Sequence, residues 1–233
     1  MLKSVYVATM HGIARPLRAT GALDRMQRAR HDSFAFWLGS QFAIHDAAAL
    51  ARMDVPWWTF PAIDAVDRWL AARSDVRVFE YGSGASTVWL ARRAAHVVSV
   101  EHDVGFATIA APMLSLPNVE LRMIEPVRAS GTPRAGSGRS GYEDCDFSAY
   151  VDSIADGAAR YDLIVIDGRA RDACLRRAWD CLGPGGLVVF DNSRRRRYQA
   201  SLESVGAPLT RLRGWAPALP YPSETTLIEK PRT

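Results

Sequence analysis

The chain has little lysine and cysteine and no long apolar run. No uninterrupted apolar segment reaches the roughly 18 residues that a membrane-spanning helix needs, so no membrane span is expected. Residues 1–20 carry Lys3, Arg15 and Arg18 but no continuous apolar core before a small-residue cleavage site, which argues against a signal peptide. The cysteines are odd in number and lack the spacing of metal ligands, which indicates a reducing compartment and predicts a cytoplasmic protein: Cys145, Cys174 and Cys181.

The formal net charge of +4 rests on arginine, because Lys3 and Lys230 are the only lysines. A mildly basic surface is compatible with acidic small molecules or with nucleic acid, and selects neither. We find no interleaved aromatic and basic platform for a single strand, so nucleic acid is not the expected partner. The apolar content of 48% is ordinary for a globular protein.

Residues 22–53 have helical character, being rich in alanine and free of proline. The aromatic and aliphatic side chains that could line one face of this segment are Phe34, Trp37, Leu38, Phe42 and Ile44. This face would pack on the core or against a second subunit, which makes a homodimer possible, and a substrate lid is the alternative. Because a residue before proline avoids the helical region, Val55-Pro56 marks a boundary. We predict an N-terminal helical extension over residues 1–55 and a second domain over residues 56–233.

The most informative stretch spans residues 78–91 and reads Val-Phe-Glu-Tyr-Gly-Ser-Gly-Ala-Ser-Thr-Val-Trp-Leu-Ala. Its apolar start, two glycines and apolar run at helical spacing predict a buried strand, a tight turn and a helix. This unit holds nucleotide-like ligands at the carboxyl end of a parallel sheet. Gly82 and Gly84 allow the turn and the close approach of a ligand, and Ser86 and Thr87 suit the first helical turn.

A second apolar run, residues 97–100, ends in Glu101-His102, and an acid at this place suits a ribose diol. A dinucleotide fingerprint would have a third glycine at Thr87, so Thr87 and the acid at Glu80 disfavour a nicotinamide-dependent oxidoreductase. Glu80, Gly82, Gly84 and Glu101 together resemble the binding motif of class I S-adenosylmethionine-dependent methyltransferases. The resemblance implies S-adenosyl-L-methionine as cofactor, with Glu80 accepting from its amine. The implied binding residues are Glu80, Tyr81, Gly82, Ser83, Gly84, Ser86, Thr87, Glu101, His102 and Asp167.

Strands and helices alternate along the remaining chain. This alternation predicts an α/β fold with a doubly wound, mostly parallel seven-stranded sheet of Rossmann-like methyltransferase type. Gly183-Pro-Gly-Gly186 reads as the end of a helix. Expected helices cover residues 62–72, 106–114, 147–159, 171–181 and 198–205; expected strands after the first two cover residues 119–124, 161–167, 187–190, 209–213 and 225–229.

Acids end two consecutive expected strands, Asp167 on one and Asp191-Asn192 on the next. If these strands are neighbours, their ends lie about 4.8 Å apart, and three side-chain oxygens could hold one Mg²⁺. Such a metal would activate an acceptor hydroxyl. The pattern resembles metal-dependent O-methyltransferases of the catechol and macrolide-sugar types, and the match covers residues 78–193. The alternative is that Asp191 and Asn192 bond their own backbone in a strand-end turn.

The resembled catechol enzymes place a lysine base three residues after the first acid, and this chain has Ala170 there. The flanking residues, Arg169 and Arg171, do not deprotonate in proteins. The candidate catalytic residues are therefore Asp167, Asp191 and His102.

Two segments near the expected site remain open to interpretation. The run Arg194–Arg197 could receive an acidic acceptor such as a phosphorylated sugar, or it could be a solvated helix start. Residues 125–142 are rich in Gly, Ser, Arg and Pro, which is typical of a mobile or functional loop.

We predict a methyltransferase that acts on a hydroxyl of a small molecule or glycan. The alternatives are a nucleic-acid-directed methyltransferase or basic binding module, and an oxidoreductase.

Overall fold

The computed structural model describes residues 12–156 and 160–232 and contains one seven-stranded sheet with the strand order β3-β2-β1-β6-β7-β9-β8. The neighbouring strands β3, β2, β1, β6 and β7 run parallel to one another, whereas β9 is antiparallel to both β7 and β8. The predicted mostly parallel seven-stranded sheet is confirmed. The strands are β1 (Arg77–Tyr81), β2 (His96–Glu101), β3 (Val119–Met123), β6 (Tyr161–Ile166), β7 (Leu182–Asp191), β8 (Leu209–Gly214) and β9 (Ser223–Glu229).

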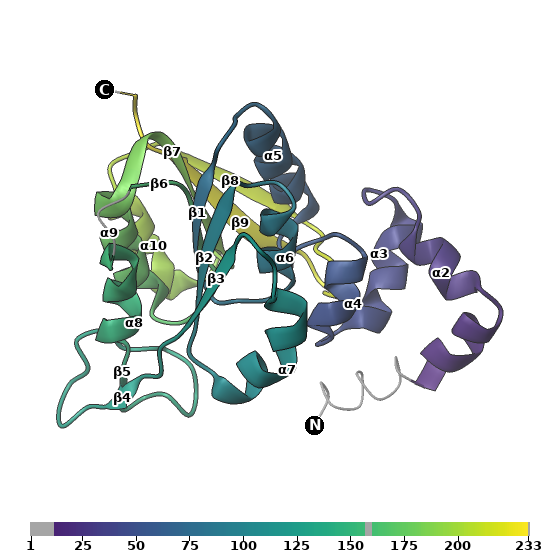
Figure 1. Ribbon diagram of the computed structural model, residues 1–233, viewed down its shortest axis with the longest axis horizontal. Helices are drawn as coiled ribbons and strands as arrows, with labels where there is room; N and C mark the ends of the chain where they lie inside the picture. Colours follow the sequence, from purple (N-terminus) through teal and green to yellow (C-terminus); the bar gives the residue numbers. More distant parts are fainter. Residues whose placement is uncertain (1–11, 157–159, 233) are drawn as a thin grey trace.

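Helices cover both faces of this sheet (Figure 1). Alternate strand residues point to opposite faces, and so Val78 lies in the core under α5 to α7 while Phe79 lies in the core under α8 to α10. Two apolar layers therefore form, as in doubly wound folds. The helices are α5 (Phe60–Ala71), α6 (Ala85–Ala91), α7 (Val104–Leu114), α8 (Ser148–Asp152), α9 (Arg171–Cys181) and α10 (Arg196–Ser204).

The helical character expected of residues 22–53 takes the form of a series of short helices. New helices begin where Ser33 and Asp46 accept hydrogen bonds from Phe36 N and Ala49 N, because these side chains cap helix starts. The predicted apolar face is corrected at Phe34, which is 72% exposed, while Phe36 is buried. The elements are α2 (Ala22–Gln27), α3 (Phe34–Ser40), the 3-10 helix η1 (Gln41–Ala43) and α4 (Ala47–Arg52).

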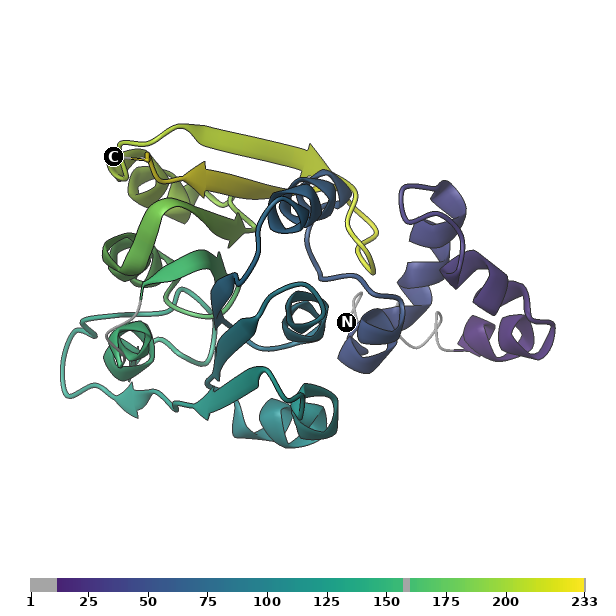
Figure 2. The ribbon, with the colours of Figure 1, turned by 45° about the horizontal axis from the view of Figure 1, so that its top comes forward.

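The extension is tied to the hairpin loop between β8 and β9 (Figure 2). Trp37 Nε1 donates to Leu219 O at 3.1 Å, and the Trp37 and Trp215 rings lie 4.7 Å apart. Phe36 and Leu50 belong to the same apolar core as the sheet. The domain boundary at residue 55 and the homodimer through these helices stay predictions.

Three further segments differ from expectation. The helix expected over residues 171–181 is confirmed as α9, but Gly183–Gly186 belong to β7, which starts at Leu182 and is longer than the expected strand over residues 187–190. The helix expected over residues 147–159 is shorter: α8 passes into the 3-10 helix η2 (Ser153–Ala155), and residues 157–159 lie outside the described residues. The expected loop contains β4 (Val127–Arg128), which pairs with β5 (Cys145–Asp146). None of the helices within the described ranges is long and apolar enough to cross a membrane.

Candidate active site at the carboxyl ends of the strands

The turn after β1 is shaped by close contact with the loop after β6. Gly82 has a φ of +98°, and a Cβ there would lie 2.7 Å from the Cα of Gly168. Asp167 N also donates to Tyr81 O at 3.0 Å, which joins the two loops. Gly82 is therefore needed for the backbone conformation and for packing.

Gly84 is placed differently in the same turn. A Cβ on Gly84 would meet no atom within 4 Å, so its α-carbon faces open space. Its N–H donates to Thr87 Oγ1 at 2.9 Å, which confirms Thr87 as a residue of the first helical turn of α6. This open space at the carboxyl edge of the sheet fits the predicted approach of a cofactor to the backbone.

Glu80 lies beneath the turn and has no exposed surface. Its Oε1 accepts from Ser86 Oγ at 2.5 Å, and its Oε2 accepts from Thr87 Oγ1 at 2.5 Å and from Ser99 Oγ at 2.7 Å. Burial raises the pKa of Glu80 to about 7, against the opposing effect of the three hydroxyls. In this arrangement Glu80 ties β1, β2 and α6 together, and Ser86 and Thr87 face it from α6.

Glu101 closes the other side of the turn. Its Oε2 accepts from Ser83 N at 3.1 Å, and its Oε1 accepts from His102 N at 2.7 Å and Asp103 N at 2.9 Å. The predicted cofactor residues at the ends of β1 and β2 are thus brought together. Glu80 and Tyr81 are exceptions. The fully buried Glu80 carboxylate, with its three hydroxyl donors, does not fit the expected hydrogen bond from a cofactor amine. The Tyr81 side chain is also fully buried, and its hydroxyl donates to Val151 O at 2.7 Å. Only the Tyr81 backbone faces the turn.

His102 is buried among aromatic rings, with ring centroids 5.5 Å from Tyr142 and 5.7 Å from Phe147. Arg169 Nε donates to His102 Nε2 at 3.3 Å, which requires a lone pair on Nε2. The ring proton is then on Nδ1, 2.6 Å from Glu101 Oε1 but without the alignment of a hydrogen bond. Because an arginine faces its free nitrogen, His102 is poorly placed to accept a proton.

Asp167 and Asp191 do come together at neighbouring strand ends, but Arg171 lies between them. Arg171 Nη2 donates to Asp167 Oδ1 at 2.8 Å, and Nη1 lies 3.9 Å from Asp191 Oδ2. The same guanidinium also donates to three backbone carbonyls, those of Asp167, Gly168 and Asp191. Burial works against its charge, but the two acids offset this and raise the pKa of Arg171.

The predicted magnesium site does not fit this arrangement. Asn192 points its amide nitrogen, not its oxygen, at Asp191 Oδ2 at 2.6 Å, and its oxygen accepts from Arg195 Nη2 at 2.6 Å. Asp191 Oδ1 accepts from Thr225 Oγ1 at 2.7 Å. A resident guanidinium thus takes the place that a divalent cation would need between the carboxylates. Nor does the described part of the chain hold any cluster of three or more His, Cys, Asp or Glu side chains suited to a metal.

The two carboxyl groups differ in access and in protonation. Burial, and then the charge of Asp167, raises the pKa of Asp191 to about 7. Burial also raises the pKa of Asp167, against the opposing effect of Arg171. The Asp167 side chain is 22% exposed, compared with 4% for that of Asp191. Asp167 is therefore the acid that an acceptor molecule can reach.

The role of Arg171 could not be predicted from the residues around Asp167. Ala170, where the resembled catechol enzymes have a lysine, adopts the left-handed conformation with a φ of 49°, and α9 begins directly after it. This strained turn directs Arg171 back over the strand ends. The only available signal was an arginine four residues after Asp167 at a helix start, a spacing that allows an ion pair.

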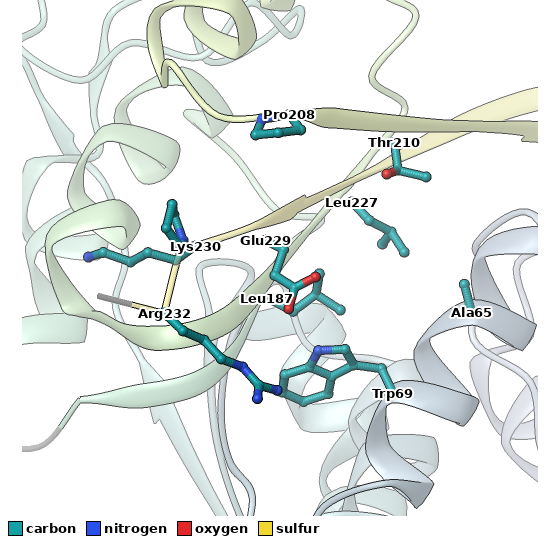
Figure 3. Close-up of a pocket in the computed structure, with 10 residues that line it drawn as sticks. Ala65, Trp69, Leu187, Pro208, Thr210, Leu227, Glu229, Lys230 and Arg232 are labelled. Carbon is teal, nitrogen blue, oxygen red and sulfur yellow. The ribbon is translucent and has the colours of Figure 1, made fainter.

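A cavity of about 430 Å³ lies away from these residues, between α5 and the strands β7 to β9 (Figure 3). It is lined by Trp69, Leu187, Leu227 and Glu229, among others. Leu187 precedes Asp191 by four residues along β7, which is about 13 Å in a strand. This cavity is therefore separate from the carboxyl edge where the predicted site residues meet.

Similar folds occur in solved structures of low sequence identity. The O-methyltransferase TomG from Streptomyces achromogenes, in complex with SAM, aligns with a TM-score of 0.56 at 20% identity, over 81% of this chain and 89% of that one. The precorrin 8w decarboxylase of Methanobacterium thermoautotrophicum aligns with a TM-score of 0.50 at 17% identity, over 75% and 92%. No protein-family model matches the chain, and no curated protein matches it. At these identities the likeness shows the fold alone, and the two activities named differ.

Proposed function

We propose that this chain, which has the fold of class I S-adenosylmethionine-dependent methyltransferases, is an S-adenosylmethionine-dependent methyltransferase that acts on a hydroxyl of a small molecule or glycan. The observation that carries this proposal is the turn after β1. Gly82 is fixed by its contact with Gly168, whereas the α-carbon of Gly84 faces open space at the carboxyl edge. In open α/β sheets this edge is where ligands bind.

Each residue around the turn has a distinct part in binding. S-adenosylmethionine, when bound, supplies an electrophilic methyl group. The backbone at Gly84 allows a close approach, and the Glu101 carboxylate, held by Ser83 N and His102 N, is the acceptor available for a ribose diol. Glu80 acts one layer deeper, because its hydrogen bonds to Ser86 and Thr87 hold the turn in shape.

Asp167 is the residue we assign as general base. An acceptor hydroxyl must lose its proton as its oxygen attacks a methyl group, and burial raises the pKa of Asp167, which suits a base in this step. Arg171 binds one Asp167 oxygen, Oδ1, and no residue within the described ranges hydrogen-bonds the other. The proton would move to Asp167 Oδ2, while Arg171 keeps the carboxyl group in position. Asp191 has both oxygens engaged by Thr225 and Asn192, so we assign it a positioning role.

Calorimetry on the full chain tests the cofactor assignment. We expect S-adenosylmethionine and S-adenosylhomocysteine to bind, and NAD not to bind. Gly84→Val should abolish binding because its branched side chain would fill the open space. Gly12→Val is the matched control, since a Cβ at that exposed glycine of the N-terminal extension also meets nothing within 4 Å. Tight binding of NAD with no binding of S-adenosylmethionine would overturn the proposal.

A further inference from the structure

Arg169 is a half-buried cation without a carboxylate partner. It follows Gly168, whose backbone touches Gly82, and it therefore lies beside the proposed site. Its Nε donates to His102 Nε2, and its guanidinium carbon is 5.8 Å from the centre of the Tyr142 ring. Within residues 12–156 and 160–232 no acid forms an ion pair with it. The donors on its two Nη atoms are left for solvent or for a ligand.

Arg93, another partly buried arginine, is neutralised by acids. Arg93 binds Asp54 at 2.8 Å and Asp67 at 2.6 Å, and its pKa is raised. The pKa of Arg169 is instead lowered, first by burial and then by the charges of Arg139 and Arg171. Holding an uncompensated cation there costs folding free energy, and an anionic ligand would remove that cost.

Further cations gather at the same edge from two other segments. Arg139 is exposed in the loop between β4 and β5, and Arg197 Nη1 donates to Gly138 O at 2.7 Å, which holds this loop against the start of α10. The exposed run Arg194–Arg197 follows β7 directly. None of these arginines pairs with an acid of the described chain. Three separate segments thus bring unpaired guanidinium groups to one end of the sheet.

We propose that the methyl acceptor carries an anionic group, a phosphate or a carboxylate, which Arg169 and Arg139 bind. This inference rests on the proposed function, because it names the acceptor class of the same site. Guanidinium groups match the oxygens of both anions with paired hydrogen bonds. The bound anion would lie near Asp167, because the charges of Arg195 and Arg169 both lower the pKa of that carboxyl group. The hydroxyl to be methylated would then be close to the assigned base.

Anion titration by calorimetry tests this inference. The full chain is first saturated with S-adenosylhomocysteine, so that the carboxylate subsite of the cofactor is filled. Inorganic phosphate and succinate are then titrated in separate arms, which distinguishes a phosphate acceptor from a carboxylate acceptor. The variants are Arg169→Gln and Arg139→Gln. Arg139 is exposed, so its replacement should leave folding intact. Arg68→Gln on α5 is the control, because Arg68 is an exposed arginine that forms no ion pair with the described residues.

We expect one anion to bind the wild-type chain, with affinity reduced about tenfold or more in each site variant and unchanged in Arg68→Gln. Absence of binding by both anions, or equal binding in all variants, would overturn the inference. Loss of S-adenosylhomocysteine affinity in Arg169→Gln, with anion binding unchanged, would also overturn it and assign Arg169 to the cofactor. If the wild type binds no S-adenosylhomocysteine, the proposed function fails. The same titrations on the unloaded chain then decide whether the anion site exists.

Discussion

A Cβ on Gly82 would lie 2.7 Å from the Cα of Gly168, so the loops after β1 and β6 touch backbone to backbone. Gly84, two residues later, has an extended φ of 171° and open space in front of its α-carbon. The two glycines of the turn therefore serve different ends. Gly82 is required by the fold, and Gly84 leaves room for a ligand.

This difference predicts unequal effects of two similar substitutions on stability. Gly82→Ala should lower the free energy of unfolding by about 2 kcal/mol or more, because it adds both an unfavourable φ and a clash with backbone. Gly84→Ala should change it by less than about 1 kcal/mol. Urea denaturation measures both values. Equal destabilisation by the two substitutions would contradict the assignment.

The buried carboxyl group of Glu80 predicts a pH-dependent stability. Its folded pKa of about 7 lies above its ordinary value of 4.5, so between these pH values the folded chain binds more protons than the unfolded chain. The stability that Glu80 contributes is present at low pH and is lost as the pH rises through 7. Glu80→Gln should flatten this fall in a comparison of melting temperatures from pH 5 to pH 8. Glu203→Gln, on the exposed surface of α10, is the control and should leave the slope unchanged.

Arg171 should be essential to stability because two buried acids depend on it. Arg171→Met leaves Asp167 and Asp191 without a counter-ion and should cost about 3–5 kcal/mol in the free energy of unfolding. The cost should grow as the pH rises above 7, since Asp191 then loses its proton. Asp191→Asn in the Arg171→Met background should recover part of the loss. Denaturant unfolding of the four chains in this double-mutant cycle measures the coupling, and additive effects would argue against it.

The resident guanidinium also predicts how the site responds to divalent cations. We expect Mn²⁺, used as a paramagnetic probe, to show no saturable binding that depends on Asp191. Water-proton relaxation should give the same weak titration for the wild type and for Asp191→Asn. A site of micromolar affinity that disappears in Asp191→Asn would restore the magnesium hypothesis and would mean that Arg171 moves aside.

Residues 125–142 should become more protected when the cofactor site is filled. Tyr142 packs beside His102, which follows the predicted ribose acid, and Gly138 is held by Arg197. Hydrogen exchange in this segment should slow on addition of S-adenosylhomocysteine. Protection in α9 should change less, because its backbone is already hydrogen-bonded. Equal exchange of the loop in the free and bound chain would show that it takes no part in binding.

The centre of the sheet could be predicted from the sequence because β1, β2, β6 and β7 each contain a short apolar run that ends at glycine or an acid. The resemblance carried by Glu80, Gly82, Gly84 and Glu101 was enough to identify the fold. The chemistry at the strand ends could not be predicted in the same way. The sequence pattern of Asp167, Asp191 and Asn192 suggested three oxygen ligands. Only the tertiary structure shows that Arg171 lies between the two acids and that the Asn192 amide directs its nitrogen toward Asp191.

The helical character of the extension could be predicted, but the limits of its helices could not. Helical spacing alone cannot show that new helices begin at the caps Ser33 and Asp46, nor that Phe34 faces solvent while Phe36 is buried. Caps act over three or four residues, but the contacts that bury this segment come from residues farther along the chain: Phe36 packs against Phe60, and Trp37 packs against Trp215.

The hydrogen bond from Trp37 to Leu219 joins residues 182 positions apart, so it constrains the order in which the chain can fold during synthesis. On the ribosome, α3 emerges long before the loop on which it docks. The strand β9, which separates β7 from β8, follows that loop. Trp37 therefore stays without this partner until the β8–β9 loop has been made. Removal of the β8–β9 hairpin would leave Trp37 without Leu219 and Trp215, and β7 without its antiparallel neighbour.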